Sequence, residues 1–143
     1  MKKNKLPIFF IITGIILSAC SKEISYKTYD DFTLSLANAG FTIEEESLEN
    51  DFLSGERKQL KIDQGEMISV YIYESDHAME QDASYISRDG FTYDKGGVAT
   101  SISWVSYPYF FKKEDIIILY VGENEKIIDT LEEIAGPQFA GQV

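Results

Sequence analysis

Cys20 is the residue of this chain whose chemistry stands out, because it is the single cysteine. It directly follows Leu17, Ser18 and Ala19, at the end of an apolar segment that begins at Leu6. A cysteine sulfur is a nucleophile that can form a thioether with a lipid donor. The small side chains before it leave the peptide bond accessible to a peptidase. The spacing therefore predicts cleavage before Cys20 and lipid attachment to its sulfur.

The segment before Cys20 has the three parts of an export signal. Lys2, Lys3 and Lys5 form a basic head, and the apolar stretch that follows is too short to span a bilayer. The string Leu-Ser-Ala-Cys resembles a bacterial lipobox. We therefore expect residues 1–19 to be a lipoprotein signal peptide and residues 20–27 to be the lipidated cysteine and a short tether. Residues 28–143 are expected to form a single domain.

The predicted anchor fixes the expected location. The positive-inside rule keeps the basic head in the cytoplasm, so the remaining chain faces outward. A diacylglyceryl cysteine, with palmitate-like acyl chains, gives stable attachment, whereas one chain binds only marginally. From Ser21 to Lys27 the tether reaches at most about 25 Å. The prediction is a protein on the outer face of the plasma membrane. The alternative is an ordinary secretory signal that leaves Cys20 as a free thiol.

The charge balance excludes one class of partner. Without the three lysines of the signal, ten basic groups face 24 acidic groups, a formal charge of −14. Phosphate contacts need clustered lysine and arginine, so nucleic acid is not expected as a partner. The abundance of isoleucine, valine, phenylalanine and tyrosine favours a folded domain over disorder.

The hydrophobic periodicity predicts an α+β fold. Helices are expected after a Thr28 cap, after a cap at Ser75 or Asp76, and after a cap at Glu123 or Asn124. Strands are expected near 41–46, 59–62, 68–73, 98–105, 109–111 and 116–121, with 92–97 as a loop. The last strand is apolar at both parities, which is typical of a central strand covered on both faces. We expect an antiparallel sheet of about five or six strands with two or three helices packed mainly on one face.

The aromatic residues suggest a binding surface. Tyr71 and Tyr73 alternate along their predicted strand with the aliphatic residues Val70 and Ile72. Trp104 and Tyr109 lie on either side of Pro108 in the sequence. Tyrosine and tryptophan combine a large contact area with a polar tip, so they suit recognition surfaces. If helices cover one face only, Tyr71, Tyr73, Trp104 and Tyr109 line an open surface. The alternative, which we favour, is that these rings form the second half of the core.

The other reactive residue types give no catalytic pattern, and we expect no catalytic residue, metal or cofactor. His77 is the only histidine, and no further histidine or cysteine accompanies it to complete a metal site. The acids Glu80 and Asp82 are expected to face water, and Glu44, Glu45 and Glu46 to be a solvated strand end. No nucleophile motif is present, and the spacing selects no carboxylate pair.

Three stretches of the chain are similar to segments of known proteins. They are the segment from Trp104 to Lys113, the strand end Ile117–Gly122 and the tail from Leu131 to Gly141 with its Phe-Ala-Gly. Together they resemble small uncharacterised lipoproteins of low-GC Gram-positive bacteria. A histidine follows the proline in those proteins, where this chain has Tyr109. The resemblance implies a lipid anchor and supplies no activity.

Three functions are consistent with these observations. The first is a binding or interaction module at the cell envelope, with a protein, peptide or sugar partner and no enzymatic activity. The second is an envelope hydrolase that uses paired carboxylates, which predicts a pocket with two close acids. The third is a protective or inhibitory lipoprotein whose acidic surface meets a basic partner, which predicts salt-sensitive binding.

Overall fold

A computed structural model describes residues 23–142 of the chain. The predicted signal peptide of residues 1–19, its Leu17, Ser18 and Ala19, and the predicted lipidation site Cys20 lie outside the described residues. Within the described part, none of the helices is long and apolar enough to cross a membrane.

Strand β7 (Ile116–Val121) lies in the middle of a six-stranded sheet, and five of its six residues are buried. It is flanked by β3 (Glu66–Ile72) and β6 (Pro108–Lys113), and both pairings are antiparallel. Successive side chains of a strand point to opposite faces, so a strand buried on both faces is apolar at odd and even positions alike. The prediction that this strand is central is confirmed. Pro108 occupies the first position of β6, where no ladder donor is needed.

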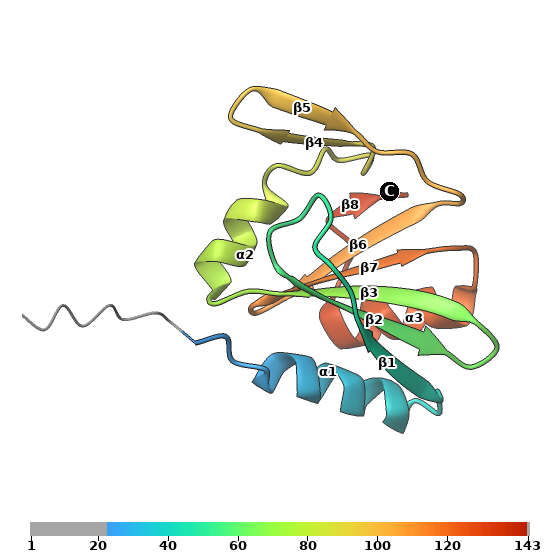
Figure 1. Cartoon of the computed structure of the whole chain (residues 1–143). Helices are drawn as coiled ribbons and strands as arrows, with labels where there is room; N and C mark the ends of the chain where they lie inside the picture. Colours follow the sequence, from blue (N-terminus) through green and yellow to red (C-terminus); the bar gives the residue numbers. More distant parts are fainter. Residues whose placement is uncertain (1–22, 143) are drawn as a thin grey trace, which may run out of the picture.

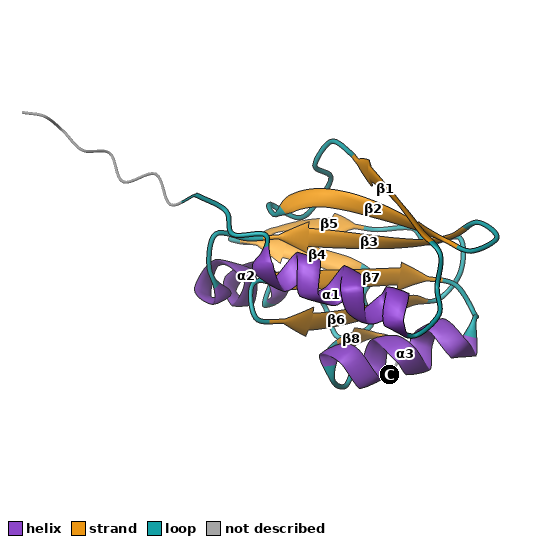
Figure 2. Cartoon of the chain, turned by 90° about the horizontal axis from the view of Figure 1, so that it is seen from below, coloured by secondary structure: helices purple, strands orange, loops and turns teal. Residues whose placement is uncertain are grey.

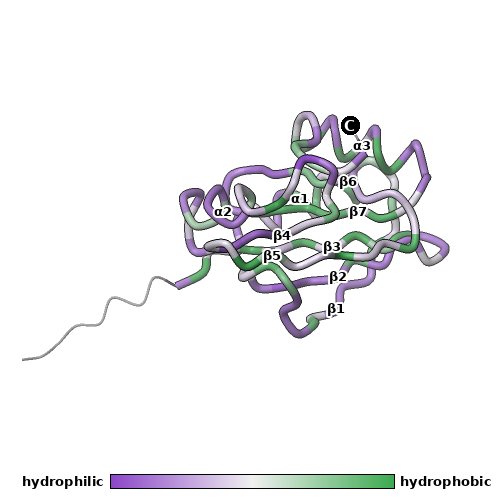
Figure 3. The backbone as a smooth tube through the Cα atoms, turned by 90° about the horizontal axis from the view of Figure 1, so that it is seen from above, coloured by the Kyte–Doolittle hydropathy of each residue, from purple (hydrophilic) through white to green (hydrophobic). Residues whose placement is uncertain are grey.

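The remaining strands extend the sheet outward on both sides. On one side β3 forms a hairpin with β2 (Glu56–Ile62), and β1 (Ile43–Ser47) is the outer strand. On the other side β8 (Ala140–Gly141) pairs with β6. The sheet order is therefore β1-β2-β3-β7-β6-β8, antiparallel throughout. The predicted α+β class with a six-stranded antiparallel sheet is confirmed. In Figure 3 the green, hydrophobic colour runs along β3, whereas β2 is largely purple.

The three helices begin near the predicted positions, and two use the predicted caps. Ser75 caps α2 (Asp76–Ala83), and Asn124 caps α3 (Glu125–Ala135) by accepting from backbone N–H groups. The predicted Thr28 cap is wrong, because α1 (Lys27–Asn38) already includes Thr28, and its N-cap residue Tyr26 makes no side-chain cap hydrogen bond. The Thr28 hydroxyl instead donates to Glu114, at 3.1 Å.

The segment after α2 differs most from the expectation. Residues 92–97 are not a loop, because β4 (Thr92–Lys95) pairs with β5 (Val98–Ser101) in a separate two-stranded sheet. Gly96 and Gly97 form the two-residue turn with φ angles of +66° and +82°, which glycine adopts without strain. The predicted strand 98–105 ends at Ser101, because β4 offers no partner beyond Thr92.

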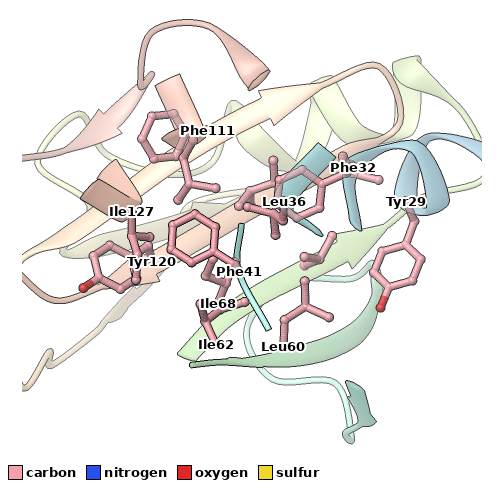
Figure 4. Packing of buried hydrophobic residues seen from close by; sticks show 14 of the residues in the cluster. Tyr29, Phe32, Leu36, Phe41, Leu60, Ile62, Ile68, Phe111, Tyr120 and Ile127 are labelled. Atoms are coloured by element: carbon pink, nitrogen blue, oxygen red, sulfur yellow. The ribbon is translucent and has the colours of Figure 1, made fainter. Parts of the chain in front are cut away.

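The sheet separates two hydrophobic clusters. Helices α1 and α3 cover one face, and α2 with the β4–β5 hairpin lies against the other (Figures 1 and 2). Figure 4 shows the first cluster, in which rings and aliphatic side chains from both helices meet the strands. Its buried members include Phe32, Leu36, Ile68, Phe111 and Ile127. The second cluster lies on the other face, and its buried members include Leu53, Tyr71, Met79, Phe110 and Leu119.

Candidate binding groove

Two of the four predicted surface aromatics are core residues. Tyr71 is 0% and Tyr73 is 4% exposed, because α2 and the segment before β2 cover their side of β3. Tyr109 packs with the opposite cluster, where its ring stacks on Tyr120 with centroids 6.3 Å apart. The four residues therefore do not form one open surface. For Tyr71 and Tyr73, the alternative that they belong to the second half of the core is confirmed.

Trp104, like Tyr109, remains partly exposed, and it lies on the other face of the sheet from Tyr109. Its indole Nε1 donates to the Gly90 carbonyl, at 2.8 Å. Two edge-to-face contacts hold the ring, with Phe52 at 6.0 Å and Phe110 at 5.9 Å between centroids. The local sequence explains the position, since residues 102–107 leave β5 and cross to β6 without a strand partner for Trp104. The indole is therefore fixed before any ligand arrives.

A cavity of about 320 Å³ is lined by Trp104 together with residues of the strands, and we call it the Trp104 groove. Its floor and walls come from β2, β3, β7, the segment before β2 and the crossing between β5 and β6. The lining residues are Asp51, Arg57, Gln59, Gly65, Glu66, Met67, Ser69, Tyr71, Trp104, Val105, Leu119 and Val121. The structure thus brings Tyr71 and Trp104 to one site, although Tyr73 and Tyr109 are not in its lining.

Arg57 and Asp51 are the charged pair of the Trp104 groove, and the sequence analysis did not single them out. Arg57 Nη1 lies 3.3 Å from Asp51 Oδ2, and the Tyr71 hydroxyl donates to the same oxygen at 2.9 Å. Arg57 Nη2 donates to the Ser69 hydroxyl, at 3.5 Å. Arg57 Nε is buried and finds no acceptor among the described residues. A guanidinium carries five N–H donors, so this one retains capacity for further acceptors.

The electrostatics of the groove follow from its burial. Burial, and secondly the Asp51 carboxylate, raise the pKa of the Tyr71 hydroxyl above its ordinary value. Tyr71 is therefore a neutral donor at physiological pH, and it holds Asp51 in place beside Arg57. The guanidinium carbon also lies 6.0 Å from the centre of the Tyr71 ring. The groove thus combines ordered donors and acceptors with the rings of Tyr71 and Trp104, an arrangement suited to binding a polar ligand.

A second polar centre lies behind the groove and is closed. Asp82 is 2% exposed, so the expectation that it faces water is wrong. Its carboxylate accepts from the Tyr73 hydroxyl at 2.8 Å, the Tyr93 hydroxyl at 2.5 Å and both the backbone N–H and the hydroxyl of Ser54. These four bonds join α2, the residue that follows β3, strand β4 and the segment before β2. Asp82 is therefore a structural residue that attaches the hairpin to the sheet.

The remaining residues considered from the sequence lie apart from the groove. His77 is exposed in the first turn of α2, and Glu80 pairs with Lys112. Glu44 and Glu45 of β1 pair with lysines of β2, and Glu45 also accepts from the Tyr29 hydroxyl. Over residues 23–142 there is no group of three or more histidine, cysteine or acidic side chains that could hold a metal ion.

Comparisons with known proteins found no matching family model, no matching curated protein and no matching solved structure. The resemblance to small lipoproteins therefore stays a prediction from the sequence. Function must be inferred from the N-terminal motif and from the Trp104 groove.

Proposed function

We propose that this chain is a lipid-anchored binding module on the outer face of the plasma membrane, and that the Trp104 groove holds its ligand. The anchor is supported by the Leu17-Ser18-Ala19-Cys20 motif after a basic head and a short apolar stretch. Binding is supported by one observation above others: the same cavity is lined by an indole that a hydrogen bond holds in place and by a guanidinium with N–H donors to spare.

The rigidity of the groove favours binding. Ordering a flexible aromatic side chain on association costs conformational entropy, and a ring that is already fixed avoids this cost. Trp104 is held by one hydrogen bond and two ring contacts, and Asp51 by Tyr71 and Arg57. The ligand gains contact area from the indole, and its acceptor atoms gain hydrogen bonds from the N–H donors of Arg57. An envelope protein loop, a peptide or a sugar carries such groups.

The hydrolase alternative gains no support from the acids of the groove. It predicts two carboxylates free to share a reaction. Asp51 is engaged by Arg57 and Tyr71, and Glu66 accepts from the Tyr120 hydroxyl at 2.9 Å. Each carboxylate is thus held by its own partners, so binding is the function that this geometry favours.

The anchor is tested by the variant Cys20→Ala in the full chain. We expect wild-type protein in the membrane fraction, labelled by radioactive palmitate, and the variant without label. Ser21→Ala is the matched control, because it changes the adjacent residue and keeps the sulfur. Recovery of unlabelled wild-type protein in the cytosol with Met1 attached would contradict the proposal.

The groove is tested by fluorescence, because Trp104 is the only tryptophan of the chain. Membrane-extracted full chain is titrated with soluble peptidoglycan fragments, and separately with the free stem peptides and the free glycan chains. We expect a saturable change in indole emission with one of these probes. Arg57→Gln should weaken it at least tenfold, whereas the control Lys126→Gln, on α3, should not. No response to any probe, or an equal loss in both variants, would refute the proposed ligand groove.

A further inference from the structure

The strands that line the Trp104 groove offer a ligand their side chains and not their backbone. Strands β2, β3 and β7 all lie inside the six-stranded sheet, with a neighbouring strand on each side (Figure 1). Their N–H and C=O groups are therefore used in the ladders of the sheet. An extended peptide usually binds a sheet by adding a strand to a free edge. These strands present no such edge, so they favour a ligand that is recognised by side chains.

The register of the sheet places the polar side chains of the groove on neighbouring positions. Gln59 pairs with Ser69, and Ser69 pairs with Leu119, so these residues form one row across β2, β3 and β7. Arg57 pairs with Tyr71 in the next row on the same face. An amide, a hydroxyl and a guanidinium therefore lie close together, and between them they can both donate and accept hydrogen bonds.

The indole of Trp104 adds an apolar surface to these polar groups. Its single polar atom, Nε1, already donates to the Gly90 carbonyl, so the ring has only carbon atoms left to offer a ligand. Met67 and Val105 contribute further apolar atoms to the lining. A matching ligand therefore combines exposed C–H groups with several small polar groups.

Charges of both signs line the groove, which disfavours a charged ligand. An anionic group would be repelled by Asp51, by Glu66 and by a chain with a net charge of −11. A cationic group would lie in the same cavity as the Arg57 guanidinium. A neutral hydroxyl group suits this lining, because it can accept from Arg57 and donate to Asp51.

A second cavity, of about 270 Å³, adjoins the Trp104 groove toward β1. The two cavities share Gln59 and Met67, and the lining of the second also includes Glu44, Glu46 and Lys61. In the β1–β2 ladder Glu46 pairs with Gln59 and Glu44 pairs with Lys61, so this lining continues the same face of the sheet. A ligand that occupies both cavities crosses β2, and it is therefore a chain of linked units.

We propose that the ligand of the Trp104 groove is an uncharged oligosaccharide, an assignment that rests on the proposed binding function. A pyranose ring carries C–H groups on its faces and hydroxyl groups around its edge. The C–H groups match the carbon surface of Trp104, and the hydroxyl groups match Arg57, Asp51 and Gln59. Further rings of the same chain occupy the second cavity toward β1.

The probes are three neutral tetrasaccharides, namely chitotetraose, cellotetraose and maltotetraose, and a neutral peptide, N-acetyl tetra-alanine amide. Each is titrated into the membrane-extracted full chain, and binding is followed by Trp104 emission and by calorimetry. We expect at least one tetrasaccharide to bind at least about tenfold more tightly than its monosaccharide unit, because only the chain reaches both cavities. Its affinity should change by less than about twofold between low and high salt, because no ion pair is formed.

The outcomes separate this assignment from the proposed binding function. If the tetra-alanine peptide or the free stem peptides bind and none of the tetrasaccharides does, the oligosaccharide is refuted and the ligand groove stands. If neither the tetrasaccharides nor the peptides nor the peptidoglycan fragments bind, both are refuted. A strong salt dependence of tetrasaccharide binding would also overturn the assignment, since charged groups would then carry the affinity.

The variant Gln59→Ala tests whether the chain spans both cavities, because Gln59 lines each of them. We expect the affinity for the tetrasaccharide to fall about tenfold, which is roughly the effect of one lost hydrogen bond. The matched control Gln81→Ala, on the exposed surface of α2, should leave it unchanged. Denaturant unfolding verifies that both variants are folded. An affinity that Gln59→Ala leaves unchanged, or that both variants lower equally, would overturn the proposal.

Discussion

The two faces of the six-stranded sheet are built differently. The face under α1 and α3 is closed by apolar contacts, with residues such as Phe32, Leu36 and Phe111 almost wholly buried. The face under α2 contains the buried Asp82 carboxylate and opens into the Trp104 groove. The difference indicates that one face chiefly provides stability, whereas the other combines stability with an accessible site. Variants on each face can test this division.

The closed face should be the more sensitive to loss of volume. Phe32→Ala removes a ring that is 1% exposed, between α1 and the sheet. We expect a loss of about 3–5 kcal/mol in the free energy of unfolding, because burial is lost and a cavity remains. Chemical denaturation measures the loss. The control Leu34→Ala, on the exposed side of α1, should change stability by less than about 0.5 kcal/mol, and a comparable loss in both would contradict the assignment.

The open face should be sensitive to a single carboxylate. Asp82→Ala leaves the hydroxyls of Tyr73 and Tyr93 and the N–H of Ser54 without their acceptor. We expect a loss of about 3 kcal/mol, since buried donors without partners are costly. The Tyr73→Phe/Tyr93→Phe double variant removes two of these donors. If the hydrogen bonds are the cause, Asp82→Ala should cost clearly less in that background than in the wild type.

High pH should weaken both faces through their tyrosines. Burial is the first cause that raises the pKa of Tyr29, Tyr71, Tyr73, Tyr93 and Tyr120, the last to about 12. The folded state therefore keeps protons that the unfolded state releases above pH 10. The stabilisation is complete below pH 10 and is lost as the pH rises toward 12 and beyond.

This pH effect is measured by denaturant unfolding together with the ultraviolet absorbance of tyrosinate. Stability should fall with rising pH above pH 10, and the five tyrosines should ionise later than the exposed ones or together with unfolding. Tyr120→Phe should remove part of the fall. A single titration of all nine tyrosines near pH 10 without unfolding would contradict the packing described.

The smallest effect on stability is expected at the rim of the groove. Val105→Ser changes a fully exposed side chain, so the free energy of unfolding should change by less than about 0.5 kcal/mol. Ligand binding measured by Trp104 emission should nevertheless weaken, because Val105 lines the groove. If Val105→Ser lowered the free energy of unfolding and left binding unchanged, Val105 would have a structural role and would not belong to a binding site.

The parts of the fold that depend on local patterns were predictable. The doubly apolar run of β7, the Ser75 and Asn124 caps and the hairpin turn around Gly65 are each readable from neighbouring residues. The hairpin at Gly96-Gly97 was missed, because its strands are short and only Tyr93 points into the core. A pair of glycines between two short β-rich runs is the signal that could have indicated it.

The groove was only partly predictable, because it depends on contacts distant in sequence. Trp104 and Tyr71 were among the expected binding residues, yet their meeting requires β3 and the crossing after β5 to face each other. The burial of Asp82 had no local signal, since its partners Tyr73, Tyr93 and Ser54 come from three other segments. Arg57 lies in a run of polar residues at the start of β2, so its sequence neighbours do not mark it as a binding residue.

Strand β8 has a consequence for the order in which the domain matures. It reaches β6 only after the other helices and strands of residues 23–142 have been synthesised, and Phe139 then packs on Phe110. At Gly141 an added β-carbon would lie 2.1 Å from the Pro108 carbonyl oxygen, so the docking tolerates no side chain there. During synthesis the outer margin of β6 stays uncovered until residues 139–141 arrive. An affinity tag fused close behind them would interfere with the closing step itself.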